Sequence, residues 1–282
     1  MTFEITEPIL VIGLGRVGAD LAEKAKKSLN SDLLLISHDQ KDLTGENSIK
    51  ISTKSVVNPS IHLIRGSTLE NLEEIEKNIS KYSTIILMSN LAGKAGIGIA
   101  PVVSKICKEQ EKNLLSFAIM PFKFEKDRIF QSGIALKRIR HDAHCTIVLD
   151  NDALLDSNPD LSHEQCNNIS NKAIESVISS LKSSEISEDV NILSTSKNAS
   201  DMEVSLKDSL RMLYEDAPPN SIKRSMLYVY GGSNVPIGVL NSISDITGGV
   251  FDENTTHVDM SSNESKIVML SSVQGEIKFD KY

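Results

Sequence analysis

Hydrophobic residues in the first half of the chain occur in short unbroken runs, separated by stretches in which they recur every three or four positions. The unbroken runs predict strands buried on both faces, as in a parallel sheet, at residues 9–12, 33–36, 84–88, 114–120 and 145–149. The periodic stretches predict helices at residues 19–29, 69–79 and 100–108. Residues 40–60 are polar and predict a loop with at most one short strand. This alternation is typical of a doubly wound, mostly parallel α/β domain, which we place at residues 1–165.

The second half begins with another helical pattern, at residues 168–183, followed by a segment rich in Ser, Asn and Glu. We expect the change of domain there, with a central helix and linker at residues 166–188 and a smaller C-terminal α/β domain at residues 189–282. Within that domain the pattern predicts helices at residues 205–214 and 235–246, and strands at residues 190–193, 225–230, near 258, 267–270 and 276–279.

Composition narrows the possible functions. The chain of 282 residues has a formal net charge of −8, and a nucleic-acid partner would require a basic face, so none is expected. The sequence contains no run of about 18 apolar residues and no signal peptide, so we expect a cytoplasmic protein without a membrane segment. The three cysteines, Cys107, Cys145 and Cys166, lack Cys-x-x-Cys spacing and predict buried free thiols.

A glycine motif follows the first predicted strand. Gly13, Gly15 and Gly18 have G-x-G-x-x-G spacing, which lets the backbone turn tightly and approach a phosphate at a helix N-terminus. Two interpretations remain open, a phosphate-binding turn and a turn that only allows the helix to pack on the sheet. An NAD site would also require an acid at the end of the second strand, and Asp39 follows that strand slightly late.

Several later segments, taken in order, resemble the FtsZ/tubulin family. Residues 85–106 resemble the region in which a strand leads into a glycine- and threonine-rich loop and then into a helix that starts Ala-Pro-Val-Val. Residues 117–125 are similar to the family's Pro-Phe-x-Phe-Glu turn, and residues 146–155 to its Ile-x-Asn-Asp strand end. Residues 34–43 are similar to its second-strand loop, and residues 227–232 to its C-terminal strand followed by Gly-Gly.

The resemblance implies a tubulin/FtsZ-like fold with a GTP or GDP site, Mg²⁺ accompanying the nucleotide, and filaments in which one subunit completes the site of the next. Asp20 takes the place of an Asn, Arg128 lies one position from the family's Arg, and Asn167 replaces a stacking aromatic. Carried over position by position, the resemblance implies these nucleotide-binding residues: Gly13, Gly15, Gly18, Asp20, Ser89, Gly93, Lys94, Ala95, Gly96, Ile97, Gly98, Glu125, Arg128, Asn151 and Asn171.

The predicted phosphate loop, residues 89–98, departs from the family pattern. Ala92 and Lys94 stand where the family has glycines, so both must avoid positive φ angles. Ala95 and Ile97 stand where it has threonines, and Ile97 removes a hydroxyl donor. Lys94 is open to two interpretations, a cation that anchors a phosphate and a solvated lysine on a loop that no longer binds.

The family's catalytic acidic loop is not recognisable. Glu185, Glu188 and Asp189 are the only acids between the central helix and the next strand, and they form either a shortened catalytic loop or a solvated acidic turn. GTP hydrolysis is therefore expected to be weakened or lost. No metal site is predicted, because His141 and His144 lack a third ligand.

Three functions fit these patterns. The first is an FtsZ-like cytoskeletal or cell-division protein that binds guanine nucleotide and self-associates head to tail. The second is a nucleotide-free paralogue that co-assembles with, or regulates, a true FtsZ. The third is an NAD-binding Rossmann protein, which rests on the first glycine motif alone. Residues 275–279 look like the family's last strand, so no C-terminal tail that docks to a membrane anchor is expected.

Overall fold

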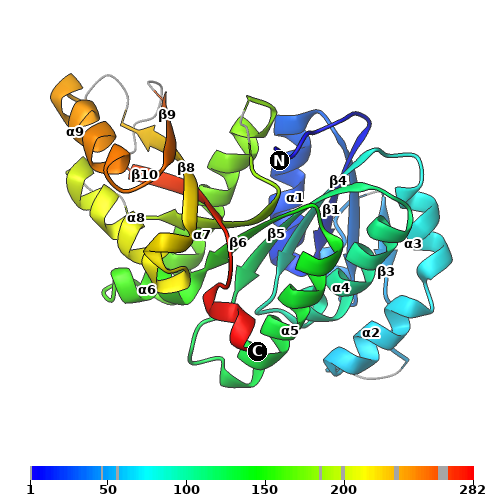
Figure 1. Cartoon of the computed structure of the whole chain (residues 1–282). Helices are drawn as coiled ribbons and strands as arrows, with labels where there is room; N and C mark the ends of the chain where they lie inside the picture. Colours follow the sequence, from blue (N-terminus) through cyan, green and yellow to red (C-terminus); the bar gives the residue numbers. More distant parts are fainter. Residues whose placement is uncertain are drawn as a thin grey trace. The chain divides into compact units, whose positions relative to one another are not determined.

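The computed structural model describes residues 2–45, 47–54, 57–183, 186–197, 201–231, 235–259 and 266–282 (Figure 1). The chain divides into two compact units. The first comprises residues 1–148, 178–189 and 282, and the second comprises residues 149–177 and 190–281. Residues 149–165, which the sequence pattern groups with the first domain, lie in the second unit.

The first unit contains the predicted alternation of strands and helices. Its strands are β1 (Ile9–Leu14), β2 (Asp32–Ser37), β3 (Ser48–Lys50), β4 (Thr84–Asn90), β5 (Asn113–Met120) and β6 (Cys145–Asp150), the last two residues of β6 belonging to the second unit. Its helices are α1 (Gly15–Leu29), α2 (Ile61–Leu69), α3 (Leu72–Ile79), α4 (Lys94–Glu109) and α5 (Lys126–Asp142), with 3-10 turns η1 (Gln40–Asp42) and η2 (Leu181–Ser183).

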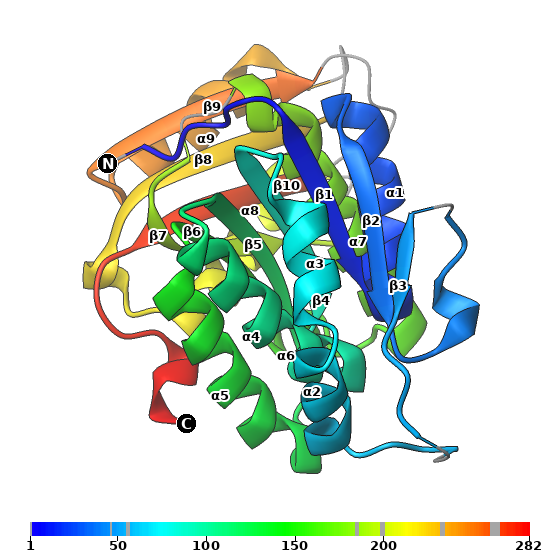
Figure 2. The same ribbon diagram turned by 90° about the vertical axis from the view of Figure 1, so that its right-hand side faces the viewer.

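The strand order in this unit is β3-β2-β1-β4-β5-β6, and β1 pairs in parallel with both β2 and β4. The chain therefore builds outward from β1 in one direction and then, from β4, in the other. Because parallel crossovers are right-handed, this reversal puts helices on both faces: α2 to α5 cover one face and α1 the other (Figure 2). β1 and β6 are buried along their whole length and β4 at every residue but its last, Asn90, so the prediction of strands covered on both faces is confirmed.

The strands of the second unit lie in the order β7-β10-β8-β9. β10 pairs antiparallel with β7 and β8, and β8 pairs parallel with β9. The elements are α6 (Asn151–Ser157), α7 (His163–Ser180), β7 (Asp189–Thr195), α8 (Met202–Asp216), η3 (Pro219–Ser221), β8 (Ile222–Tyr230), α9 (Ile237–Gly248), β9 (Glu253–Asp259), β10 (Lys266–Val273) and η5 (Lys278–Lys281).

Three predictions of local structure are wrong. The helix expected at residues 69–79 is two helices, because Glu70 and Asn71 interrupt it between α2 and α3. The helix expected from residue 100 begins six residues earlier, at Lys94, so half of the predicted phosphate loop is helical. The strand expected at residues 276–279 is a 3-10 turn, in which Asp280 accepts a hydrogen bond from the backbone N–H of Ile277 at 2.8 Å.

The composition also led to predictions about the cysteines and about membrane-spanning segments. Cys107, Cys145 and Cys166 are buried and form no disulfide bond, as predicted. Burial raises the pKa of the Cys107 thiol to about 12, so this thiol is unreactive at neutral pH. Within the described ranges, no helix has both the length and the apolar character needed to span a bilayer.

Candidate phosphate site at the edge of the first sheet

Two glycine-bearing turns meet where the strand order of the first unit reverses. β1 and β4 are neighbours, with Leu14 paired to Ser89 near their carboxyl ends. A Cβ atom added to Gly15 would lie 2.9 Å from the Cβ of Ala95, so the turn after β1 touches the first turn of α4. In open α/β sheets, ligands bind at this topological switch point, outside the carboxyl ends of the strands. The fold therefore places both predicted phosphate segments at the position where a ligand is expected.

Close backbone packing explains the glycines of the first turn. A Cβ on Gly13 would lie 2.7 Å from the carbonyl oxygen of Gly18, and one on Gly18 would lie 2.5 Å from that of Met88. Gly15 has a φ angle of 65°, a conformation that side chains other than glycine rarely adopt. The G-x-G-x-x-G spacing thus satisfies the requirement for tight helix–sheet packing.

The turn after β4 is closed by its own backbone. The N–H of Leu91 donates to the carbonyl of Ile119 at 2.8 Å, that of Ala92 to the side chain of Asn90 at 2.9 Å, and that of Gly93 to the carbonyl of Asn90 at 3.1 Å. These three N–H groups are therefore already engaged inside the protein. Among the described non-glycine residues, positive φ angles occur only at Asn30, Glu111 and Asp189, so Ala92 and Lys94 fit this turn without strain.

The free donors lie one step further on, at the N-terminus of α4. Gly93 is the N-cap residue, with φ −92°, and as a glycine it has no side chain to cap this end of the helix. The N–H groups of Lys94, Ala95 and Gly96 have no acceptor within the helix, and they carry the positive end of its dipole. A Cβ atom added to Gly96 would lie 2.1 Å from the carbonyl oxygen of Asn90 and would clash with it. The first turn of α4 is thus pressed against the end of β4, in an arrangement that suits an anion.

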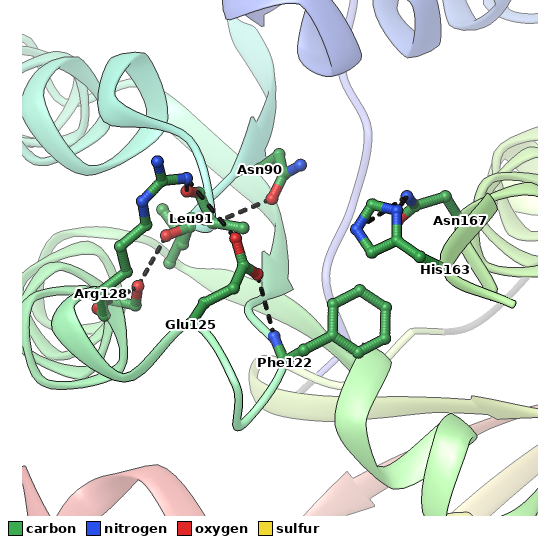
Figure 3. A network of polar contacts seen from close by, with 9 residues as sticks. Asn90, Leu91, Phe122, Glu125, Arg128, His163 and Asn167 are labelled. Atoms are coloured by element: carbon green, nitrogen blue, oxygen red, sulfur yellow. Dashed lines mark hydrogen bonds and ion pairs between the residues drawn. The ribbon is translucent and has the colours of Figure 1, made fainter. Parts of the chain in front are cut away.

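Helix α5 holds the outer side of the same turn (Figure 3). Arg128 Nη1 donates to the carbonyl of Ala92, and the buried Ser132 hydroxyl donates to the carbonyl of Leu91 at 2.6 Å. Glu125 lies 3.5 Å from Arg128 Nη1 and also accepts from the N–H of Phe122 at 3.2 Å. Glu125 and Arg128, predicted as nucleotide contacts, therefore have partners within the protein that a ligand would have to share.

The ammonium group of Lys94 is hydrogen-bonded within the protein. It donates to Asn58 Oδ1 at 2.6 Å and to the carbonyl of Pro59 at 2.8 Å. Both acceptors are neutral, so the positive charge of Lys94 is not cancelled by a carboxylate in these bonds. The first turn of α4 therefore carries a cation as well as its backbone donors.

The loop after β2 carries two titratable residues, His38 and Asp42, that the sequence patterns did not single out. Asp42 accepts a hydrogen bond from the Ser37 hydroxyl at 2.7 Å, and its Oδ2 lies 4.0 Å from where a Cβ of Gly15 would be. Burial lowers the pKa of His38, and Lys94 lowers it further, whereas Asp42 and Asp39 raise it. The signal that could have found them is their position directly after a strand that neighbours β1.

Other predicted residues of the first unit serve packing. The Ser89 hydroxyl is buried and donates to the carbonyl of Phe117 at 2.9 Å, which ties β4 to β5. The Ile97 side chain is fully buried, and a Cβ on Gly98 would lie 2.9 Å from Ile64 Cγ2, so this part of α4 packs against α2. Asp20 is exposed on α1.

Two predicted residues belong to the second unit. Asn151 is buried, and its side chain accepts a hydrogen bond from the Ser170 hydroxyl at 2.6 Å. Asn171 is half-buried on α7, where Asn167 also lies within 3.2 Å of the ring of His163 (Figure 3).

The predicted acids lie close to the start of β7. Glu188 precedes this strand and is half-buried, Asp189 is its first residue and is exposed, and Glu185 lies outside the described residues. No group of three His, Cys, Asp or Glu side chains in the described part of the chain could hold a metal ion.

Comparisons with known proteins agree with this architecture. Residues 65–159 match the sequence model of the "Tubulin/FtsZ family, GTPase domain". "Cell division protein FtsZ 2" of Halobacterium salinarum is 30% identical over 165 residues, which are 54% of this chain and 41% of that protein. "Cell division protein FtsZ" of Aquifex aeolicus is 27% identical over 89 residues, or 31% of this chain and 24% of that protein. The match thus spans less than half the length of these curated relatives.

Similarity to solved structures extends over nearly the whole chain. "FtsZ dimer, empty (M. jannaschii)" matches 98% of this chain and 91% of that one, with a TM-score of 0.74 and 16% identity. "CetZ1 from Haloferax volcanii - GDP bound monomer" matches 97% of this chain and 96% of that one, with a TM-score of 0.69 and 15% identity. At these identities the similarity establishes the fold, and the predicted tubulin/FtsZ-like α/β class is confirmed.

Proposed function

We propose that this chain, which is a divergent FtsZ-like protein, binds the phosphate groups of GTP or GDP at the N-terminus of α4. The observation that carries the proposal is the uncapped first turn of α4, which touches the Gly13–Gly15 turn at the switch point of the sheet. Three backbone N–H groups and the dipole of a 16-residue helix there provide a site for negative charge.

The neighbouring side chains suggest how the negative charge of the bound nucleotide is balanced. The Lys94 ammonium adds positive charge beside the first turn of α4, held in place by Asn58 and Pro59. Asp42 is half-buried close to Gly15, and its carboxylate would hold the Mg²⁺ that accompanies a nucleotide, since Mg²⁺ prefers oxygen ligands. Glu125 and Arg128 fix the turn after β4, so we assign them to positioning the site.

We further propose that the protein self-associates head to tail and hydrolyses GTP slowly or not at all. One FtsZ with this fold is described as a dimer. Weak hydrolysis is suggested by the sequence after the central helix, because Glu185, Glu188 and Asp189 do not reproduce the family's acidic loop.

A second candidate is a nucleotide-free paralogue that assembles with a true FtsZ. The observation in its favour is the closed turn after β4, in which the N–H groups of Leu91, Ala92 and Gly93 are engaged and Arg128 holds the carbonyl of Ala92. The NAD alternative rests on the glycine turn and on Asp39, whose carboxylate accepts from the N–H of Lys41 at 3.0 Å and keeps acceptor sites for a ribose hydroxyl.

The test begins with the purified protein. Bound nucleotide is released with acid and identified by chromatography, and the emptied protein is titrated with a fluorescent GDP analogue with and without Mg²⁺, using NADH as a competitor. We expect Lys94→Gln, which keeps a donor for Asn58, to weaken binding roughly threefold, and Lys94→Glu roughly tenfold, since charges at helix N-termini contribute up to about 2 kcal/mol. The matched control is Lys27→Glu, an exposed position at the far end of α1.

Several outcomes would contradict the proposal. Failure of GTP and GDP to bind at millimolar concentration would favour the nucleotide-free paralogue, and displacement of the probe by NADH would favour the Rossmann alternative. Sedimentation with and without GTP, together with phosphate release, then tests self-association and hydrolysis separately. Self-association to the same extent with and without GTP would show that assembly does not depend on the nucleotide site.

A further inference from the structure

A groove separate from the phosphate site runs between α2, α3, α4 and α5 of the first unit, which lie on the same face of the sheet (Figure 2). Its volume of about 640 Å³ is within the range of sites that hold several side chains. The floor is apolar, and Leu69 at the end of α2 leaves 52% of its surface exposed. The apolar lining residues are Leu69, Leu72, Pro101, Val102 and Ile106.

The rim of this groove is mainly basic on a chain whose net charge is −8. Its two acids are already paired: Glu109 lies 3.5 Å from Lys105, and Asp142 lies 3.2 Å from Lys108. Arg65 and Arg138 also line the groove, and neither forms an ion pair with a carboxylate in the described part of the chain. The rim thus has a local excess of positive charge.

The two arginines are close enough to affect each other. Burial lowers the pKa of Arg65, and the charge of Arg138 lowers it further. Arg65 Nη2 donates to the carbonyl of Ile97 at 3.1 Å, which fixes the side chain, while its buried Nε has no hydrogen-bond partner among the residues that the structure describes. Two like charges held together without a counter-ion favour an added anion, and the planar guanidinium fits a carboxylate.

We propose that this groove binds an acidic peptide segment of a partner protein, with apolar side chains on the floor and carboxylates at Arg65 and Arg138. A segment with both features matches the groove, whose apolar floor and unpaired arginines lie side by side. A membrane surface fits less well, because Glu109 and Asp142 interrupt the basic rim and the whole chain is anionic.

This site is independent of the proposed nucleotide site. The groove uses residues 101–109 of α4, whereas the phosphate site uses its first turn. At about 1.5 Å per residue, Lys94 and Lys105 are roughly 16 Å apart along the helix. Failure of nucleotide binding would therefore leave the groove proposal untouched, and failure of peptide binding would leave the nucleotide proposal untouched.

The experiment selects ligands without assuming their sequence. A random library of 16-residue peptides is displayed and panned against the full chain, and the enriched peptides are synthesised with a fluorescent label. We expect the enriched pool to carry net negative charge and apolar residues at regular spacing. Fluorescence anisotropy should then show at least a tenfold weaker affinity for the Arg138→Glu variant.

The control and a second variant keep the test decisive. Lys137→Glu makes the same charge change one residue away, on an exposed position outside the groove, and should alter affinity less than twofold. Leu69→Asn removes an exposed apolar side chain from the floor and should weaken binding at least threefold, with little effect on folding. Circular dichroism during heating confirms that each variant is folded.

Four outcomes would overturn the proposal. The first is no enrichment of peptides, and the second is an enriched pool that is neutral or basic. The third is affinity that is the same for wild type and Arg138→Glu. The fourth is another ligand that depends on Arg138: either vesicles containing phosphatidylglycerol that bind wild type but not Arg138→Glu, or self-association that Arg138→Glu abolishes without added peptide.

Discussion

Helices α4 and α6 each come after a strand, α6 directly after β6 and α4 after a short turn, yet their backbone donors are satisfied in different ways. At α6, in the second unit, Asp150 is the N-cap residue and its carboxylate accepts the N–H of Asp152 at 2.9 Å. At α4, in the first unit, the N-cap residue is Gly93 and no side chain caps the helix. One helix therefore carries its own anion, and the other leaves its positive end available.

The surroundings of the two helix ends follow from this difference. Around Asp150, the ammonium of the half-buried Lys278 donates to its carboxylate and lies 3.5 Å from Asp216 and 4.0 Å from Asp152. Around α4, the nearby cation Lys94 is bonded to neutral oxygens only. A helix N-terminus is thus informative about ligands only after its capping group has been examined.

The largest expected effect is at the self-capped end. Lys278→Met should lower the free energy of unfolding by about 3–5 kcal/mol, because it leaves buried carboxylates without their cation. Urea denaturation at pH 7 measures this loss. The control is Lys223→Met, which removes a half-exposed partner 3.7 Å from Asp252 and should change stability by less than about 1 kcal/mol. Equal effects of the two substitutions would show that the buried cluster has no special importance.

At the open end, Gly96→Ala should be nearly as damaging. Its methyl group would meet the backbone oxygen of Asn90, which cannot move without disturbing the end of β4, so we expect a loss of about 3 kcal/mol. Gly93→Ala is the matched control: its Cβ would lie 3.4 Å from the same oxygen, and its φ angle of −92° suits alanine. Urea midpoints compare the two variants, and a fully stable Gly96→Ala protein would contradict the packing of this helix end.

A smaller effect is expected from the clamp on the turn after β4. Ser132→Ala should lower stability by about 1–3 kcal/mol, because the buried carbonyl of Leu91 loses its donor. Ser104→Ala is the comparison, since that equally buried hydroxyl donates only to Ala100, a carbonyl of its own helix, at 2.9 Å. If both serines can be removed at equal cost, Ser132 does not hold the turn.

The smallest effect depends on pH and concerns Asp216. Burial raises its pKa well above the usual 3.8, and the charge of Asp150 raises it further, although Lys278 lowers it. The folded state therefore holds this proton more tightly than the unfolded state. The resulting stability is fully present below the usual pKa and is lost as pH rises through the folded pKa, at up to about 1.4 kcal/mol per pH unit.

Asp216→Asn removes this titration while keeping the shape of the side chain. The free energy of unfolding of the variant, relative to that of wild type, should increase by on the order of 1 kcal/mol between pH 5 and pH 8. Unfolding curves at intervals of one pH unit measure the difference. A constant difference across this range would mean that Asp216 stays ionised in the folded protein.

The sequence patterns predicted the local features well and the long-range ones poorly. Unbroken apolar runs identified the strands of the first unit, and the spacing of Gly13, Gly15 and Gly18 identified the turn after β1, because both depend on neighbouring residues. They misplaced the start of α4, since a glycine-rich stretch has low helix propensity and only its packing against β4 and α2 makes it helical. The sequence patterns also identified Arg128 as a candidate, but not its hydrogen bond to the carbonyl of Ala92.

By itself, the sequence determined that the chain forms buried parallel strands, carries a glycine turn and resembles the FtsZ family in the order of its segments, since all three are local or sequential properties. Only the tertiary structure decided which helix N-terminus is capped and which is open. The Lys278–Asp150 pair joins residues 128 positions apart, and the Ser132–Leu91 bond joins residues 41 apart. Contacts of this kind depend on how the chain is packed, and no spacing of residue types along it records them.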